Sequence, residues 1–359
     1  MSITIPRQLA NGQASDRVDD FVNHYIHEHH IPGCAIMVRH NGNVVTGGYG
    51  IANLEHDVKV TPKTVFQSAS VGKQFTDMAV MLLVDEGKLS LDDPVSKYFK
   101  DLKLPDEWSG ITVRHLLTHT SGLGNYPKWL TYQEYYDENG LLNMVTMERL
   151  CYGPGERFEY SNLGYATLGI LIHQVSGELY GDFLQKRVFD PLGMKHTRVI
   201  SEEDVIQNRA AGYFLDDNNH PKNQVWVSPT FNSTADGTLY FTVEDLAKWA
   251  EALDAKRLLS PASFEQTWTP FKLKDGTNGP HPYGFGWFID RTNSGHRKLW
   301  HDGGWQGFSA YIARYPNDHL TVATLCNCRD AETRYITEHI AGFYVPTLES
   351  PLQLNTQTH

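Results

Sequence analysis

The sequence is poor in cysteine, in long apolar runs and in clusters of basic residues, and each shortage excludes a class of protein. Four cysteines in 359 residues do not look like a disulfide framework. No stretch approaches the roughly 18 apolar residues that a membrane-spanning helix needs, so we expect no membrane span. The net charge is −11, from 31 Lys and Arg against 42 Asp and Glu, and no basic run offsets it. The chain is therefore a poor candidate for binding nucleic acid.

The chain also lacks the signals of export, of metal binding and of one common hydrolase fold. The stretch MSITIPRQLANG has no basic segment followed by an apolar one, so we expect a cytoplasmic protein, or a periplasmic or secreted one if a signal was removed. Cys326 and Cys328 share a face of a predicted strand, but no further ligands lie nearby, and HYIHEHH does not match H-E-x-x-H. We predict no metal and no organic cofactor. No serine fits G-x-S-x-G, so the nucleophile elbow of α/β-hydrolases is absent.

Hydrophobic spacing predicts strands near both ends of the chain and helices between them. The predicted helices are DRVDDFVNHYI with Ser15 as cap, the helix after FQSAS that ends at Gly87, the stretch from Thr112 to Gly122, SNLGYATLGILIHQVS ending at Gly177, VEDLAKWAEAL capped by Thr242, PASFEQTW capped by Ser260, and ETRYITEHIAGFY. The predicted strands are a hairpin around Asn41 and Gly42, YGFGWFI, LWHDGGWQGFSAYIARY and LTVATLCN.

This order of elements predicts an α+β fold, in which the N- and C-terminal parts of the chain form one antiparallel sheet flanked by helices. A mostly helical lobe is inserted in the middle. We expect a single domain over residues 15–345, with a sheet lobe at about 15–69 and 283–345, a helical lobe at about 70–282, and a tail over 346–359. A site between two such lobes is where clefts usually form.

One short stretch, FQSASVGKQFTD, places a serine and a lysine one helical turn apart. Residues three apart on a helix share a face, so Ser70 and Lys73 are expected to be neighbours. The backbone N–H of Ser70 is also free, because the first N–H groups of a helix have no internal partner. A lysine can take the serine proton if burial lowers its pKa. On its own the S-x-x-K pattern is loose, and a solvated helix start remains the alternative.

Two later stretches make the pattern specific. ERFEYSNLGY contains Tyr160 and Asn162, and WHDGGWQGF contains His301 two residues before Gly303. S-x-x-K, then Y-x-N, then a basic residue-x-Gly on a late strand, in this order, is typical of penicillin-recognising serine enzymes. From about Val18 to Tyr344 the chain resembles the class C β-lactamase-like serine hydrolases, which include β-lactamases, DD-peptidases, D-aminopeptidases and β-lactamase-like esterases. The resemblance implies a β-lactamase/transpeptidase-like fold.

The resemblance also implies a role for each catalytic position. Ser70 would attack the carbonyl and become acylated, and Lys73 would take or relay its proton. Tyr160 would be the general base or acid, with its phenol near Ser70 and ionised by the Lys73 charge. Asn162 would hydrogen-bond Lys73 or the substrate carbonyl. Lys73 and Tyr160 can share the proton in more than one way and can titrate as a coupled pair.

The late strand would supply the oxyanion site and part of the substrate site. The backbone N–H groups of Ser70 and Gly304 would bind the oxyanion, and Gly303 would let the substrate lie close to the strand. His301 departs from the β-lactamases, which carry a lysine there that binds the substrate carboxylate. A histidine is mostly neutral at pH 7, so strong β-lactamase activity is not expected. Alternatively, His301 only holds the turn by a hydrogen bond. Asp302, the next residue, is unusual for a site that attracts an anion.

Aromatic residues are expected to line the pocket and to favour an apolar acyl group. Trp305 follows the oxyanion turn, and Trp287 and Trp300 lie on neighbouring strands, where a core position is the alternative. Tyr126 and Trp129 follow TSGLG, where the family has a loop at the pocket edge.

Together these features predict a serine hydrolase that works through an acyl-enzyme on a small-molecule substrate. The favoured substrate is a carboxylic ester with a short or medium acyl chain. A D-amino-acid peptide or amide is the main alternative substrate. Two further alternatives are a weak β-lactamase side activity and a module that binds penicillin-like ligands without turning them over. Hydrolysis and acyl transfer both stay open, as does the oligomeric state.

Overall fold

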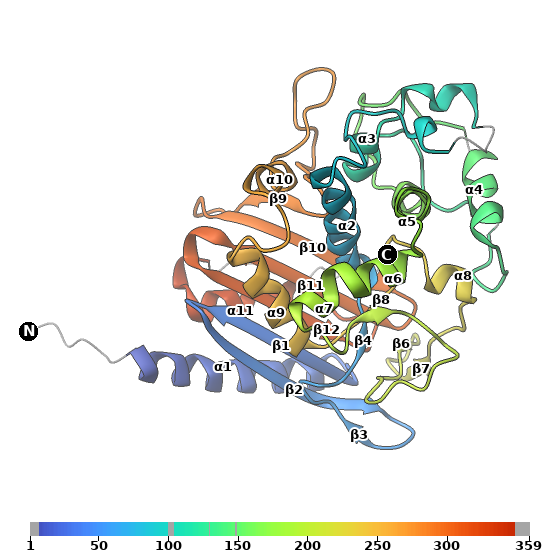
Figure 1. The fold of residues 1–359 in the computed structure, drawn as a ribbon. Helices are drawn as coiled ribbons and strands as arrows, with labels where there is room; N and C mark the ends of the chain where they lie inside the picture. The colour runs from blue at the N-terminus through green and yellow to red at the C-terminus, as the bar shows by residue number, and fades with distance from the viewer. Residues whose placement is uncertain (1–6, 100–103, 129, 148, 349–359) are drawn as a thin grey trace, which may run out of the picture.

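The computed structural model describes residues 7–99, 104–128, 130–147 and 149–348 (Figure 1). Its largest sheet has seven strands in the order β3-β2-β1-β12-β11-β10-β9, and each neighbouring pair is antiparallel. In this sheet β1 (Gly33–His40) pairs with β12 (Leu320–Cys326). The N- and C-terminal parts of the chain therefore form one antiparallel sheet, which confirms the predicted fold class.

The remaining elements surround this sheet. The other strands are β2 Asn43–Asn53, β3 Val58–Lys59, β4 Phe66–Gln67, β5 Arg198–Val199, β6 Tyr213–Leu215, β7 Pro221–Asn223, β8 Leu239–Phe241, β9 Phe288–Arg291, β10 Arg297–Trp305 and β11 Phe308–Tyr315. The α-helices are α1 Arg7–Glu28, α2 Lys73–Asp85, α3 Val113–Leu117, α4 Glu138–Met147, α5 Asn162–Ser176, α6 Tyr180–Leu184, α7 Asp190–Leu192, α8 Pro229–Asn232, α9 Val243–Asp254, α10 Pro261–Thr267 and α11 Thr333–Tyr344.

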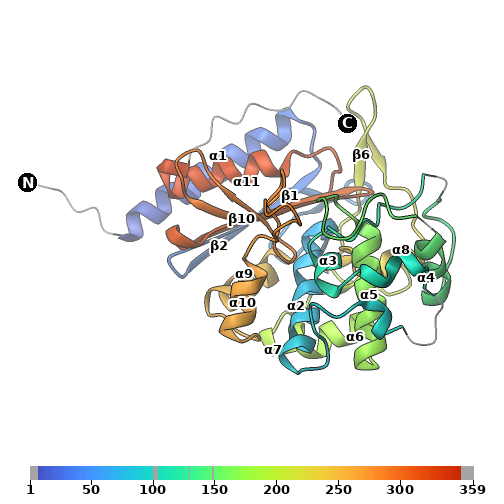
Figure 2. The same cartoon turned by 90° about the horizontal axis from the view of Figure 1, so that it is seen from above.

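Alternate residues of the central strands face two different cores, as the two-residue period of a strand requires. Ile36 and Val38 of β1 pack in a core with α1 and α11, which lie side by side on that face of the sheet (Figure 2). Ala35 and Met37 belong to the other core, together with α2, α5 and α9. Helices thus cover both faces of the sheet. Helix α2, which begins at Lys73, packs in the second core.

Local signals explain most helix ends. Ser161 caps α5 by accepting a hydrogen bond from the N–H of Gly164 at 2.9 Å, and α5 ends at Gly177, whose φ of 74° is left-handed. Thr112 caps α3 in a full capping box with His115. The cap at Thr112 and the end at Gly177 agree with the sequence-based expectations, whereas the cap at Ser161 was not predicted.

Four predicted boundaries are wrong. The first helix begins at Arg7 and not at Ser15, because the residues after Pro6 include good helix formers and no further proline. Helix α3 ends at Leu117 and does not reach Gly122, because His119 adopts a left-handed φ of 57°.

The other two wrong boundaries lie near the end of the chain. The predicted strand YGFGWFI is mostly a turn, since Gly286 has a φ of 69°, and β9 begins only at Phe288. Cys328 lies beyond the end of β12, so it does not share a strand face with Cys326. Both cysteines are buried in the core with α11.

In the part of the chain that the structure describes, no helix is long and apolar enough to cross a membrane. The middle of the chain contacts the sheet directly, because α9 packs on β1 and β12. The division into a sheet lobe and a helical lobe at residues 70 and 282 stays a prediction.

Candidate active site

Ser70 and Lys73 lie at the junction of a short turn and helix α2. Ser70 is in the 3-10 turn Ala69–Gly72, and Lys73 is the first residue of α2. The Nζ of Lys73 lies 3.1 Å from the Oγ of Ser70, within hydrogen-bonding distance. The sequence spacing therefore brings the expected nucleophile and base together.

Lys73 is completely buried and held by acceptors from two other segments. Its Nζ donates to the Oδ1 of Asn162 at 2.8 Å and to the backbone carbonyl of Asp236. Burial lowers the pKa of Lys73 to about 8, although the negative charges of Asp236 and Asp302 act to raise it. At pH 7 about a tenth of the lysine is then neutral and able to accept a proton.

Tyr160 lies beside this pair. Its ring centroid is 4.8 Å from the Nζ of Lys73 and 4.3 Å from the ring of His119. The hydroxyl is buried and has no hydrogen-bond partner among the described residues. Burial raises the pKa of Tyr160 well above its usual value, and the nearby Ser70 hydroxyl acts in the opposite sense. The structure therefore favours a protonated phenol in the free protein over the ionised one that the sequence analysis expected.

The pairing of β10 leaves the N–H of Gly304 without a partner on β11. Trp305 and Phe308 close the two-residue turn between β10 and β11 and form a hydrogen-bonded pair. Because such pairs alternate, Gly304 opposite Ser309 is a non-hydrogen-bonded pair, and its N–H points away from β11. On that side β9 pairs only with residues 297–300 of β10. The N–H of Gly304 thus lies outside the ladder of the described strands, and the oxyanion role expected for it together with the N–H of Ser70 stays a prediction.

Two glycines enclose the turn that carries the nucleophile. A Cβ on Gly303 would lie 2.7 Å from the backbone nitrogen of Ser70, and one on Gly237 would lie 2.8 Å from its Cα. Between them Ala69 adopts a left-handed φ of 45°, which costs an alanine about 1 kcal/mol or more. The missing Cβ of Gly303 therefore makes room for the nucleophile turn; Gly303 also lines the cavity, and the close approach of substrate to this strand stays a prediction.

His301 does not reach the cavity. Its ring is fully buried, with Nε2 3.0 Å from the hydroxyl of Tyr283 and Nδ1 2.6 Å from the carbonyl of Asp302. Burial lowers the pKa of His301 to about 4, so the ring is neutral at physiological pH. The predicted substrate contact of His301 does not fit this position; the alternative, a histidine that holds the turn by hydrogen bonds, does.

The predicted pocket-edge aromatics also lie away from the nucleophile. Tyr126 donates from its hydroxyl to the Oδ2 of Asp236 at 3.2 Å, and so supports the residue whose carbonyl holds Lys73. Trp305 packs edge-on against Tyr132, with ring centroids 5.1 Å apart. Neither lines the cavity at Ser70. Trp129 lies outside the described residues.

The cavity at the nucleophile has a volume of about 530 Å³. It is lined by Ser70, Phe158, Glu159, Tyr160, His281, Phe288, Trp300, Asp302, Gly303 and Gly304. The predicted aromatic wall therefore exists, although it is formed by Phe158, Phe288 and Trp300, while Trp287 is a core residue. Sequence reasoning missed Phe158, Glu159 and Phe288, because no motif marks them.

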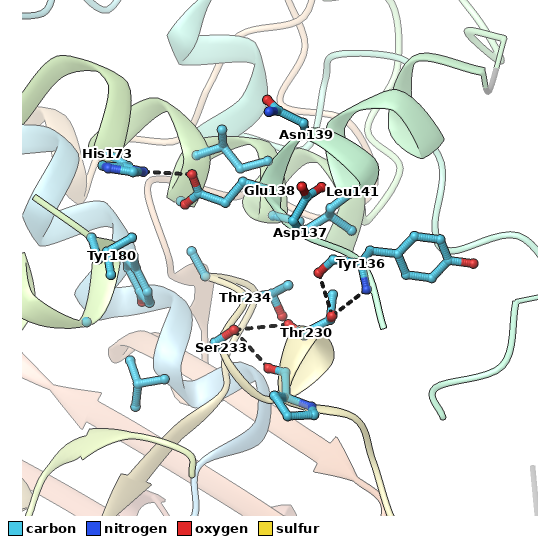
Figure 3. A pocket seen from close by; sticks show the side chains of 18 of the residues that line it. Tyr136, Asp137, Glu138, Asn139, Leu141, His173, Tyr180, Thr230, Ser233 and Thr234 are labelled. Atoms are coloured by element: carbon cyan, nitrogen blue, oxygen red, sulfur yellow. Dashed lines mark hydrogen bonds and ion pairs between the residues drawn. The ribbon is translucent and has the colours of Figure 1, made fainter. Parts of the chain in front are cut away.

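A larger cavity of about 750 Å³ lies between α4, α5, α6 and α8 (Figure 3). The Nδ1 of His173 lies at hydrogen-bonding distance, 2.7 Å, from the Oε2 of Glu138 in its lining, and Thr230 and Thr234 line it from the segment around α8. Ser233 lines this cavity, but its hydroxyl donates to the backbone carbonyl of Pro229 at 2.9 Å, so the described lining has no counterpart of the Ser70–Lys73 pair. Size alone therefore does not mark the catalytic cavity.

Comparison with known proteins settles the family. The model of the beta-lactamase family matches residues 18–343. The chain belongs to the beta-lactamase family. Members of this family are generally serine hydrolases, and the match confirms the resemblance inferred from the three motifs.

Relatives within the family include penicillin-binding proteins. Protein flp of Staphylococcus aureus strain MW2 is 30% identical over 343 residues, which cover 91% of this chain and 66% of that protein. Penicillin-binding protein 4* of Bacillus subtilis strain 168 is 29% identical over 326 residues, covering 86% of this chain and 70% of that one. The chain thus spans slightly less than two thirds of the length of flp.

Solved structures show the same fold. The octameric penicillin-binding protein homologue from Pyrococcus abyssi matches with a TM-score of 0.81 and 30% identity, covering 92% of this chain and 77% of that one. The penicillin-binding protein from Bacillus halodurans matches with a TM-score of 0.78 and 26% identity, covering 88% and 97%. The β-lactamase-like fold predicted from the sequence is confirmed.

Proposed function

We propose that this member of the beta-lactamase family is a serine hydrolase that forms an acyl-enzyme on Ser70. The observation that carries the proposal is the 3.1 Å contact between the Ser70 Oγ and a buried Lys73 whose pKa is lowered to about 8. A serine becomes a useful nucleophile only when a neighbouring base takes its proton. Intact Ser70, Lys73 and Tyr160 also argue against a module that only binds its ligand.

In the first half-reaction neutral Lys73 takes the proton of the Ser70 hydroxyl while Oγ attacks the substrate carbonyl. The N–H groups of Ser70 and Gly304 stabilise the oxyanion. Collapse of the tetrahedral intermediate breaks the bond to the leaving alcohol or amine, which receives a proton from the Tyr160 hydroxyl as Lys73 returns its proton to Tyr160. Water then attacks the ester on Ser70 by the reverse proton path and releases the acid.

The substrate that we propose is a carboxylic ester with a short or medium acyl chain. Phe158, Phe288 and Trp300 form an apolar wall beside the nucleophile, and such walls favour an apolar acyl group. A second candidate is the amide of a D-amino acid, which the two exposed carboxylates in the lining, Asp302 and Glu159, favour. Neither lysine nor arginine is among the described lining residues, which disfavours the carboxylate of a β-lactam.

A paired rate assay tests the proposal. Purified protein is given p-nitrophenyl butyrate, D-alanine p-nitroanilide and nitrocefin in parallel, with Ser70→Ala as the control for background hydrolysis. Turnover of the ester that is lost in Ser70→Ala supports the esterase. Preference for the anilide would replace the esterase by the amidase. If no substrate is turned over above the Ser70→Ala control, the proposed hydrolase activity is wrong.

A further inference from the structure

The carboxylate of Asp302 is the group in this site that the hydrolysis mechanism does not use. Asp302 precedes Gly303 on β10, and the alternation of the strand sends its side chain to the side opposite the buried His301. The side chain of Asp302 is 64% exposed, whereas that of His301 is 0% exposed. A negatively charged group therefore faces the cavity at the position next to the one where the β-lactamases carry a lysine.

Asp302 lies close to the reacting centre. It is two residues from Gly304, so their Cα atoms are separated by about 6.6 Å along the strand, and both residues line the cavity with Ser70. An ammonium group bound by the Asp302 carboxylate would then be a few bonds from the carbonyl carbon that Ser70 attacks.

Neither lysine nor arginine lines the described cavity with Asp302, and the basic side chain there is the exposed His281. The described lining residues include a second exposed carboxylate, Glu159. The Nδ1 of His301 lies 3.8 Å from the Asp302 carboxylate, but burial lowers the pKa of His301 to about 4, so that ring is neutral at physiological pH. A cleft lined by one sign of charge concentrates ligands of the opposite sign.

The walls of the cavity fit the same kind of ligand. Phe288 and Trp300 stack with ring centroids 4.4 Å apart and line the cavity beside Asp302. The Trp300 ring already has the cations of Lys298 and Arg334 at 5.4 Å and 5.1 Å from its centroid, so this wall supplies apolar surface beside the carboxylate, and the charge of Asp302 is what attracts the ammonium group.

We propose that the substrate carries a protonated amine a few bonds from the scissile carbonyl, and that Asp302 is the residue that binds it. The proposal rests on the proposed acyl-enzyme hydrolase and narrows its substrates to aminoacyl esters or amides. Binding the amine also assists the chemistry. The charge of Asp302 opposes the lowering of the Lys73 pKa, so a cation at Asp302 favours the neutral lysine that the mechanism needs.

Three esters of nearly equal size test the proposal. The p-nitrophenyl esters of butyric acid, β-alanine and succinic acid end in a methyl, an ammonium and a carboxylate group at the same place in the acyl chain. Values of kcat/KM are measured for each ester and corrected for spontaneous hydrolysis with Ser70→Ala. The wild-type protein should prefer the β-alanyl ester to the butyrate by about three- to tenfold, as expected for a partly exposed ion pair, and added salt should weaken the preference.

Substitutions of Asp302 decide between a charge effect and a change of shape. Asp302→Asn should bring the ratio of the β-alanyl ester to the butyrate close to one, and Asp302→Lys should shift the preference to the succinyl ester. Glu159→Gln is the matched control, since it removes a carboxylate from the same cavity, and it should lower the ratio less. An exposed side chain tolerates these changes, so folding is not expected to limit the test.

The outcomes separate this proposal from the function on which it rests. Acylation of Ser70 without a preference for the cationic ester, or with a preference that Asp302→Asn leaves unchanged, would overturn the role of Asp302 alone. A preference that only Glu159→Gln removes would also overturn it. If none of the three esters acylates Ser70, the proposed hydrolase fails, and the amine proposal fails with it.

Discussion

The Nε2 of His301 lies 3.0 Å from the hydroxyl of Tyr283, inside the protein. The ring centroids of His301 and Tyr160 are 6.0 Å apart. His301, at the position where the β-lactamases that this chain resembles carry a lysine, therefore packs beside Tyr160, the residue that we propose transfers protons.

This position makes His301 a positioning residue. His301→Asn should lower kcat by about 10-fold or more, because Tyr160 loses its support, while KM changes by less than about twofold. Steady-state kinetics on the best ester measure both constants. His281→Asn is the control, since His281 is exposed at the cavity. A raised KM with an unchanged kcat in His301→Asn would show that the histidine binds substrate after all.

The pH dependence of the reaction should follow Lys73. Because Lys73 acts as a base with a pKa of about 8, kcat/KM should rise about tenfold per pH unit below pH 8 and level off above it. His301, with a pKa of about 4, should add no inflection near pH 6.5. A pH–rate profile from pH 5.5 to 9.5 checks this, and a profile that is flat through pH 8 would contradict it.

Asp302 should influence the same profile. Its charge raises the pKa of Lys73, so Asp302→Asn should shift the rising limb to lower pH. The measurement uses a neutral ester, so that the charge of the substrate does not contribute. A shift to higher pH would mean that Asp302 does not act on Lys73 as described.

The two neighbouring glycines of β10 should respond differently to alanine. A Cβ on Gly303 meets the Ser70 backbone at 2.7 Å, so Gly303→Ala should displace the nucleophile and lower kcat about 100-fold. A Cβ on Gly304 meets nothing within 4 Å, so Gly304→Ala should leave the turn in place and act mainly through contact with substrate, as a raised KM. Equal losses of kcat in the two variants would contradict the close packing at Gly303.

A stability prediction concerns the opposite face of the sheet. Glu338 of α11 is buried, pairs with Lys298 at 2.8 Å and accepts from the hydroxyl of Tyr311 at 2.9 Å. Glu338→Ala should lower the free energy of unfolding by about 3–5 kcal/mol, because it leaves a buried lysine unpaired. Urea denaturation measures the loss, with Glu332→Ala at the exposed start of α11 as control.

The same pair gives a stability change in acid. Burial raises the pKa of Glu338, but the charges of Lys298 and Arg334 and the hydrogen bonds to the carboxylate outweigh it, so the pKa lies below its usual value. The pair therefore stabilises the protein fully above about pH 4.5, and this contribution is lost as the pH falls further. In Glu338→Ala the acid-dependent loss of stability should be smaller than in the wild type. An unchanged acid dependence would rule out this role.

The parts of the site that short-range geometry determines could be predicted from the sequence. Ser70 and Lys73 are three residues apart, so the local chain conformation alone brings them together. The Y-x-N motif identified Tyr160 and Asn162, and both lie beside Lys73 in the structure. The fold class followed from strands at both ends of the chain, which β1 and β12 join.

The residues that depend on distant packing could not be predicted. The carbonyl of Asp236 that holds Lys73 is 163 residues away from it in the sequence, and no motif marks it. The stretch Trp300–His301–Asp302 contains no clear apolar alternation, so only the sheet itself shows that His301 is buried and Asp302 exposed. The protonation state of the Tyr160 hydroxyl likewise depends on burial by residues that are distant in the sequence, such as His119.

The central claim, that Ser70 is the acylated nucleophile, is tested most directly by mapping a covalent label. Wild-type protein is treated with a fluorophosphonate and digested, and the modified peptide is identified by mass spectrometry. We predict a single adduct on Ser70 and none in Ser70→Ala, with the same circular dichroism spectrum for both proteins. An adduct on another serine, or labelling that persists in Ser70→Ala, would contradict the account.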